Sequence, residues 1–404
     1  MKKLTTTLSL ISLALCSTAH SESFTAKHAG QGFTSITHDF TSALSNPALL
    51  NKFDDDDDFY LSLNLGLAAA DEYEVLDIGE AIADQIEDLD EDIDNLINVP
   101  QEELPSYITG LNQQIDNIVT DLTTVDEKPV NLRTGLNALI IIPNKYLSMG
   151  FFVNQYGRLG MSVDYTDSDK SVLENAITTG NLDINDLQSS ATGLGYSVAE
   201  AGAMFAYEIL KHKKYDVNLG AKIKYQRLDL FYNTVNVASF DDDDFDLTDD
   251  EFLTDSDGVN VDLGLHLAFG DQRQWHVAFV ANNLTKQEVS LIDQDLTFQL
   301  DMSSSVGISY QNHWLTVSGE VDLTDRASFK QLQAPKYASV GAELDWGEHV
   351  QFRLGARSDL NDIEGNLYTV GFGLSPWDVV SFDIAAFKGD NDNLGAAIQL
   401  GIKI

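Results

Sequence analysis

The chain has 404 residues, a formal net charge of −40 at pH 7 and a single cysteine, Cys16. Nucleic acid carries the same sign of charge, so an acidic balance of this size excludes it as a partner. No apolar run approaches the ~20 residues of a transmembrane helix. If the chain crosses a membrane, it must therefore cross as a closed β-barrel, in which every backbone group is satisfied.

Residues 1–21 have the features of a secretory signal peptide. Lys2 and Lys3 form a positive start, residues 8–16 are a short apolar run, and small residues near position 21 suit a cleavage site. We therefore expect Sec-dependent export and a mature chain without cysteine, which excludes disulfides and thiol chemistry. The alternative is a lipoprotein signal with Cys16 as the lipidated residue, although Leu15 is larger than the residue that such signals favour.

Residues 22–57 are rich in small side chains and precede the first convincing strand. Gly30 and Gly32 allow close backbone approach and positive φ. In the run Asn46, Pro47, Ala48, the proline fixes its own φ and keeps Asn46 out of the helical region, which favours a tight turn. If the strands that follow close a barrel, such a segment fits inside it, and we predict a hatch over 22–57.

Residues 71–127 predict an acidic helical hairpin inserted in the first external loop. Ile82, Ile86, Leu89 and Ile93 recur at helical spacing, a second apolar stripe follows two prolines, and 71–127 contains no Lys or Arg. The hairpin either packs its two apolar stripes together or offers them to a partner.

Period-two alternation dominates residues 58–404, which we predict to form an all-β, closed, antiparallel transmembrane barrel of about 14 strands. The connections alternate between short turns and long acidic loops, which is typical of outer-membrane barrels with short periplasmic turns. The predicted strands are 58–68, 131–142, 146–165, 191–210, 214–232, 258–269, 274–283, 302–310, 313–323, 336–346, 349–358, 366–374, 378–387 and 393–404.

Charged residues that share the polar parity of their strands are predicted to face the lumen, because Arg or Lys on the lipid face would cost ~2–4 kcal/mol at the midplane. They either pair into a rigid filling or line a charged permeation path. These residues are Lys222, Lys224, Glu320, Asp322, Glu343, Asp345, Arg353, Arg357 and Asp383.

No catalytic constellation stands out, so we predict no enzyme, no catalytic residue and no cofactor. Acidic runs at 54–58 and 241–244 have oxygen ligands of the kind that calcium prefers. Both runs lack the spaced ligands and glycine turn of an ordered site, and we predict no metal site.

The segment AGQGFTSITHDFTSALSNPALLNKF resembles the N-terminal hatch of the FadL-type (OmpP1/FadL/TodX-like) long-chain fatty-acid transporters. The resemblance implies that the hatch plugs a fourteen-strand barrel. A wider similarity, in segments such as SVAEAGAMFAYEI, LGAKIKYQRLDLFYN and YTVGFGLSPW, is to the outer-membrane family of conjugal transfer protein TraF.

These resemblances imply a monomeric protein of the Gram-negative outer membrane that contacts lipid, lipopolysaccharide and the barrel assembly machinery. We expect a FadL-like passive passage for a small hydrophobic molecule, gated at Asn46, Pro47 and Ala48. The alternative is a cell-surface interaction or conjugation-associated structural protein that uses the acidic hairpin, with a closed barrel as anchor.

Overall fold

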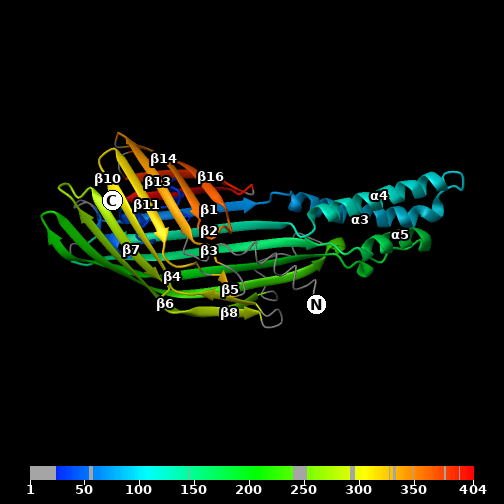
Figure 1. Cartoon of the computed structure of the whole chain (residues 1–404), viewed down its shortest axis with the longest axis horizontal. Helices are drawn as coiled ribbons and strands as arrows, with labels where there is room; N and C mark the ends of the chain where they lie inside the picture. Colours follow the sequence, from blue (N-terminus) through cyan, green and yellow to red (C-terminus); the bar gives the residue numbers. More distant parts are fainter. Residues whose placement is uncertain are drawn as a thin grey trace.

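The computed structural model describes residues 24–53, 58–144, 146–239, 253–291, 296–326, 328–330, 334–347, 349–376, 379–390 and 392–404. The expected signal peptide and most of the two acidic runs lie outside these residues. Within them, the dominant element is one closed barrel of fourteen antiparallel strands (Figure 1). Strand β1 pairs with β2 on one side and with β17 on the other, which closes the ring.

The barrel strands confirm the predicted segments to within a few residues at most ends. Their bounds are β1 Tyr60–Ala70, β2 Pro129–Ile142, β3 Ser148–Asp164, β4 Ser190–His212, β5 Tyr215–Asn236, β6 Leu253–Phe269, β7 Trp275–Asn282, β10 Ser303–Gln311, β11 Leu315–Asp322, β13 Tyr337–Trp346, β14 Val350–Asp359, β15 Asn366–Leu374, β16 Val380–Gly389 and β17 Leu394–Lys403.

The outer face of the barrel carries an apolar band, because alternate residues of each strand are exposed leucine, isoleucine, valine and phenylalanine. Exposed aromatic side chains gather where the short turns join the strands, as in the girdles of membrane barrels. They are Tyr146, Tyr207, Trp275, Trp314 and Trp346. We call this end of the barrel the short-turn end and the opposite one the long-loop end.

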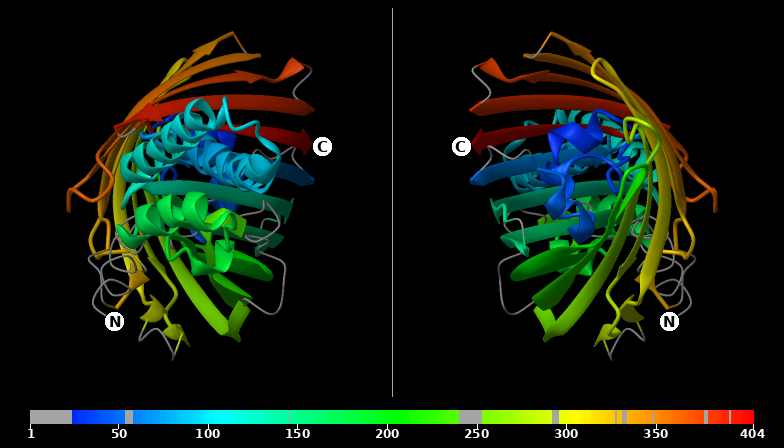
Figure 2. Two further views of the ribbon diagram at one scale, coloured as in Figure 1. Left: turned by 90° about the vertical axis from the view of Figure 1, so that its right-hand side faces the viewer. Right: turned by 90° about the vertical axis from the view of Figure 1, so that its left-hand side faces the viewer.

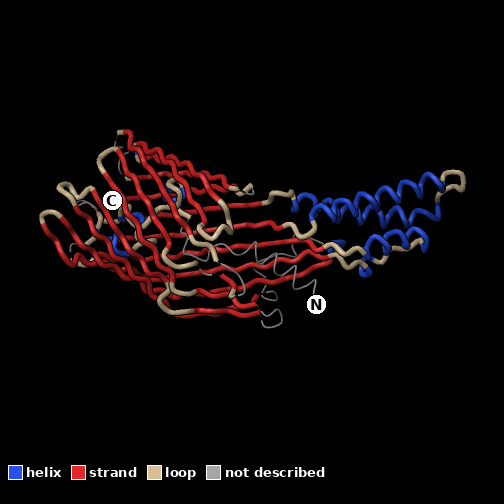
Figure 3. Tube along the Cα trace, viewed as in Figure 1, coloured by secondary structure: helices blue, strands red, loops and turns tan. Residues whose placement is uncertain are grey.

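The barrel wall is much taller on one side than on the other (Figure 3). Strands β4 and β5 have 23 and 22 residues, whereas β7 and β11 have 8 each. On the outer face of β5, apolar Ile223 and Tyr225 give way to the ion pair of Arg227 with Asp229. That change marks where β5 leaves the apolar band, and at ~3.3 Å per residue the rest of the strand extends about 30 Å further.

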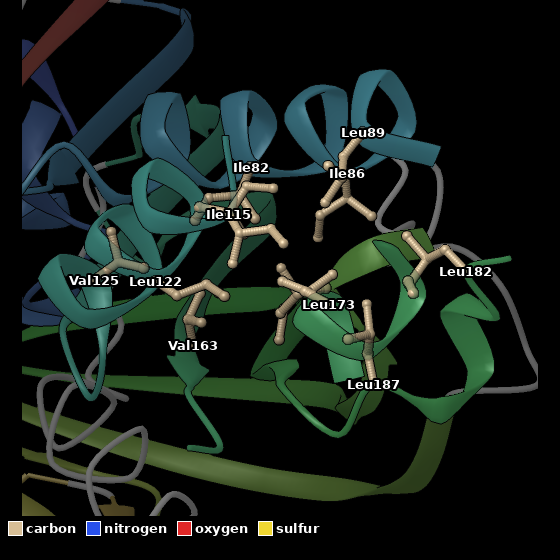
Figure 4. Close-up of a cluster of buried hydrophobic side chains, with 14 of the residues drawn as sticks. Ile82, Ile86, Leu89, Ile115, Leu122, Val125, Val163, Leu173, Leu182 and Leu187 are labelled. Carbon is tan, nitrogen blue, oxygen red and sulfur yellow. The ribbon is translucent and has the colours of Figure 1, made fainter. Parts of the chain in front are cut away.

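A helical extension continues this tall wall at the long-loop end (Figure 1). It consists of α3 (Val75–Asn95), α4 (Leu104–Val125) and α5 (Ser168–Thr179). The apolar stripes of α3 and α4 face each other and α5, so Ile82, Ile115 and Leu173 lie in one buried cluster (Figure 4). Residues 167–190 were expected to be a loop, but α5 and the short η4 (Ile184–Asp186) occupy most of them.

A small second sheet was also missed. Strands β8 (Gln287–Leu291), β9 (Leu296–Leu300) and β12 (Ser328–Phe329) pair in the order β12-β9-β8, where we had expected loops. Phe298 and Phe329 from this sheet are fully buried and pack with Tyr196 and Leu228 of the tall wall. The rings of Tyr196 and Phe298 stack with centroids 4.5 Å apart.

The N-terminal segment, which we define as residues 24–53, lies inside the ring of strands (Figure 2). It contains α2 (Ala26–Ala29), η1 (Phe40–Ser42) and η2 (Pro47–Asn51). Within the described part of the chain, no helix is both long enough and apolar enough to cross a membrane.

Candidate functional site

The N-terminal segment fills the lumen with polar as well as apolar side chains. The α2 turn lies against β15, β16 and β17, whereas η2 lies against β3, β4, β5 and β6. Buried polar side chains of the segment are Thr25, His28, Gln31, Thr34, Ser35, Thr37, His38, Ser42 and Asn46. Because buried polar groups need partners, the contacts of this segment with the wall decide how firmly it is held.

The turn at Asn46, Pro47 and Ala48 begins η2. Asn46 is fully buried, and its Oδ1 accepts a hydrogen bond of 3.0 Å from Ala48 N while its Nδ2 donates one of 2.9 Å to Ile36 O. Pro47 occupies the first helical position, where its missing N–H costs nothing. The turn is therefore fixed both by its own cap and by the chain ten residues before it.

Glycines on the inner face of the wall let this turn approach closely. A methyl group added at Gly220 of β5 would collide with the backbone of Pro47 and Ala48, and one added at Gly264 of β6 would meet the Asn46 side chain. On the opposite wall, Gly371 of β15 faces Gly30 in the same way.

Gly32 has a further requirement for glycine. Its φ is +66°, and a side chain there would meet the backbone of Val340 and Ala356. Gly355 of β14 in turn faces the Gly32 backbone. We call these wall glycines, Gly220, Gly264, Gly355 and Gly371, the glycine seats.

Side chains of the wall also hold the backbone of the N-terminal segment. Lys222 Nζ donates to Leu44 O at 2.8 Å, and Glu320 Oε2 accepts from Ser35 N at 2.9 Å. Thr369 Oγ1 accepts from Gly32 N at 2.9 Å. These hydrogen bonds come from the three strands β5, β11 and β15, so the segment is held from several sides of the barrel without being part of the wall.

Lys222 also belongs to a buried ion network on the tall wall. Its Nζ lies 2.8 Å from Asp262 Oδ2, while Lys224 Nζ lies 2.7 Å from Glu200 Oε1 and 3.1 Å from the same Asp262 oxygen. All four side chains are 0% exposed. Two cations and two carboxylates thus neutralise each other at mid-lumen.

A second network lies near the short-turn end. Arg353 Nε donates to Glu343 Oε2 at 2.5 Å, and its Nη1 donates to Asp383 Oδ1 at 2.6 Å. Nearby, Lys27 Nζ of α2 lies 2.6 Å from Asp39 Oδ2. Burial disfavours the charged forms of Lys27 and Asp39, but the attraction between the two charges is larger than this effect. The pKa of Lys27 is therefore raised above its ordinary value, and the pKa of Asp39 is lowered well below its own.

A third network surrounds Glu364 at the long-loop end. Arg158 Nη1 lies 2.7 Å from Glu364 Oε1, and Arg133 and Arg357 lie 3.7 and 3.9 Å from Oε2. Arg357 also stands over the Tyr337 ring, 4.2 Å from its centroid.

The structure places all nine charges predicted for the lumen on the inner face of their strands. Lys222 and Lys224 share one network, and Glu343, Arg353 and Asp383 share another. Arg357 joins the third network, Asp322 pairs with Arg326 at 2.6 Å, and Glu320 binds backbone. Asp345 lies half-buried beside the second network. The sequence analysis did not identify five further charged residues of these networks, Glu200, Asp262, Arg133, Arg158 and Glu364. The first four have the inward parity of their strands, and Glu364 lies in the loop just before β15, so these positions were the available signal.

Among the described residues, no group of three or more His, Asp or Glu side chains is arranged to hold a metal ion. His266 and His276 form a stacked pair with 3.1 Å between Nε2 and Nδ1, and none of the residues that the structure describes joins them as a third ligand.

A closed, even-stranded, antiparallel barrel with an apolar outer band, an aromatic girdle and a polar interior is a bacterial outer-membrane β-barrel. The model of the family described as "F plasmid transfer operon, TraF, protein" matches residues 43–322, more than half of the chain. The chain belongs to this family, as its sequence segments had indicated. No curated protein sequence matches it.

Solved structures with the same fold include three transporters or channels. The toluene transporter TbuX of Ralstonia pickettii has a TM-score of 0.56 at 11% identity, with 96% of this chain and 100% of that chain covered. The monoaromatic hydrocarbon channel CymD has a TM-score of 0.51 at 11% identity, with coverages of 94% and 96%. A FadL homologue of Pseudomonas aeruginosa has a TM-score of 0.50 at 11% identity, with coverages of 94% and 97%. At such identity the likeness shows the fold alone.

Proposed function

We propose that the chain is a passive, non-enzymatic passage through the outer membrane for a small molecule, with the N-terminal segment as its gate. The observation that carries this proposal is the way the segment is held. It fits against glycine seats and is held to the wall by side-chain hydrogen bonds and not by strand pairing, so its movement would break no strand pairing of the wall.

The likeness to hydrocarbon transporters supports a hydrophobic solute. Apolar surface near the long-loop end also supports it, because a small crevice of about 40 Å³ is lined by Val130, Met161, Val163 and neighbouring apolar residues. A solute would pass from there to the short-turn end, which we assign to the periplasm, once the turn at Asn46 leaves its glycine seats.

Replacement of Gly220 by alanine tests the gate. The added methyl group collides with the backbone of Pro47 and Ala48, so the turn must leave its seat, whereas alanine fits the strand itself. We expect normal assembly, seen as heat-modifiable migration on a gel, together with higher conductance in planar bilayers. Uptake of the apolar dye 1-N-phenylnaphthylamine by cells should also rise.

Gly258→Ala is the matched control, because a methyl group at Gly258 of the neighbouring β6 meets nothing within 4 Å. Conductance and dye uptake should stay at the wild-type level in this variant. If Gly220→Ala assembles normally and neither measurement changes, the N-terminal segment is a fixed filling and the gate proposal is wrong.

A second candidate function is favoured by the helical extension. It projects beyond the barrel, and residues 71–127 carry many acids and no Lys or Arg (Figure 1). The apolar stripes are buried within the extension, so a surface partner would meet its acidic face. Deletion of residues 71–127 should abolish such an interaction and leave the gate phenotype of Gly220→Ala intact.

A further inference from the structure

A hollow of about 360 Å³ opens at the short-turn end of the barrel, next to the N-terminal segment. Its walls come from that segment and from strands β1, β13, β14, β16 and β17, with the β15–β16 turn at its rim. Its volume falls at the lower end of the ~300–1,000 Å³ that small-molecule sites occupy. Neither the family nor the proposed gate assigns a ligand to this hollow.

The cations of the hollow are already committed to carboxylates. Arg353 bridges Glu343 and Asp383 at 2.5 and 2.6 Å, and Lys27 pairs with Asp39 at 2.6 Å. Among the described residues of the lining, with Lys403 at the rim included, there are three cations and four carboxylates, the fourth carboxylate being that of Asp345. An anion would find no unpaired cation at the centre of the hollow.

Asp345 supplies the charge that is left over. It lies on the inner face of β13, half-buried, and among the described residues its carboxylate has no hydrogen bond or ion pair. A carboxylate held in a partly dry hollow without a partner costs free energy, which a bound cation would recover.

Tyr60 and Phe40 form the aromatic part of the lining. Tyr60 is only 3% exposed, so its ring is held in place by packing. Its ring meets that of Phe40 edge-on at 5.2 Å, so an aromatic wall stands beside the acidic one. Aromatic faces attract cations as well as apolar rings.

We propose that this hollow is a binding site for a small organic cation, an amine whose ammonium group pairs with Asp345 and whose apolar part lies against Tyr60 and Phe40. The site does not require passage through the barrel, because it exists with the N-terminal segment in place, and that segment supplies Phe40 to it.

Three ring compounds of nearly equal size test the charge preference on the purified full-length protein in detergent. Benzylamine is the cation, benzyl alcohol the neutral analogue and benzoate the anion. Isothermal titration should show saturable 1:1 binding of benzylamine, with benzyl alcohol at least tenfold weaker and benzoate not bound. Stronger binding of benzoate, equal binding of all three compounds or no binding at all would overturn the proposal.

Variants then locate the site. Asp345→Asn should weaken benzylamine binding at least tenfold, and Asp345→Glu should retain it, because only the charge is needed. Asp271→Asn is the matched control, since it removes one carboxylate from an exposed turn at the same end, with a side chain 88% exposed. Gel migration confirms folding of each variant, and unchanged affinity in folded Asp345→Asn would place the site elsewhere.

Discussion

Replacing Lys222 by methionine should loosen the gate as well as the wall. The side chain is 0% exposed, and its ammonium group makes two contacts of 2.8 Å, one to Asp262 in the wall and one to Leu44 O in the N-terminal segment. Methionine fills similar space without the charge. The variant therefore removes an anchor of the segment and one cation of the mid-lumen network together.

The two losses can be separated by comparison with Lys224→Met. Each variant leaves the four-charge network with one carboxylate in excess, and breaking a buried pair in this way costs ~3–5 kcal/mol of barrel stability. Only Lys222→Met also removes the bond to Leu44 O. A hydrogen bond from a charged donor is worth ~1.5–3 kcal/mol, which corresponds to roughly ten- to hundredfold more frequent opening.

Two assays check this reasoning. Urea unfolding of the detergent-folded barrel should give similar free energies of unfolding for the two variants. Open probability in planar bilayers should rise strongly in Lys222→Met and little in Lys224→Met. Equal open probabilities would refute a role for Lys222 in holding the N-terminal segment.

Two further predictions concern other parts of the molecule. Ile115→Asp should unfold the helical extension, because Ile115 is 1% exposed and an unpaired buried charge is costly. Ile97→Asp is the control, because Ile97 is 90% exposed and the extension should stay folded. Limited proteolysis should cleave the extension only in Ile115→Asp, while the barrel of both variants stays heat-modifiable. Acid should open the gate, because burial and then nearby Lys27 lower the pKa of His38 from 6.5 to about 4. Neutral His38 stabilises the closed position of the N-terminal segment fully above pH 6.5, and this stabilisation is lost as the pH falls towards 4. Open probability in planar bilayers should therefore rise between pH 6.5 and 4. It should rise less in His38→Asn, which has no imidazole to protonate.

The barrel could be predicted from the sequence because each strand repeats a simple local pattern. Alternation such as that in 394–404 predicts both a strand and which of its faces is apolar. The alternating loop lengths predict that consecutive strands are antiparallel neighbours, with all long loops at one end. The small β8-β9-β12 sheet alternates too, at Val289 and Phe298, but its strands have only two to five residues. Such short runs cannot be told from loops before their packing partners are known.

The lumen could be predicted only in part. Strand parity shows that Lys222 and Glu343 face inward, but their heights along the barrel depend on the stagger between strands that are distant in the chain. Parity therefore did not pair Lys224 with Glu200. The glycine seats carried a signal, since glycines recur at inward positions such as Gly341 and Gly355, yet only the folded N-terminal segment shows what approaches them.

The glycine seats also constrain the order in which the molecule is built. They come from strands that are far apart in the chain, Gly220 and Gly264 from β5 and β6, and Gly355 and Gly371 from β14 and β15. The bond between Gly32 and Thr369 spans 337 positions, a separation that makes pairing slow. If the barrel closed before the N-terminal segment was in place, the folded segment would have to enter the lumen through an open end of the barrel. Closure of β1 on β17 around a segment already inside is the simpler route, and the N-terminal segment would then be the template against which the last strands pair.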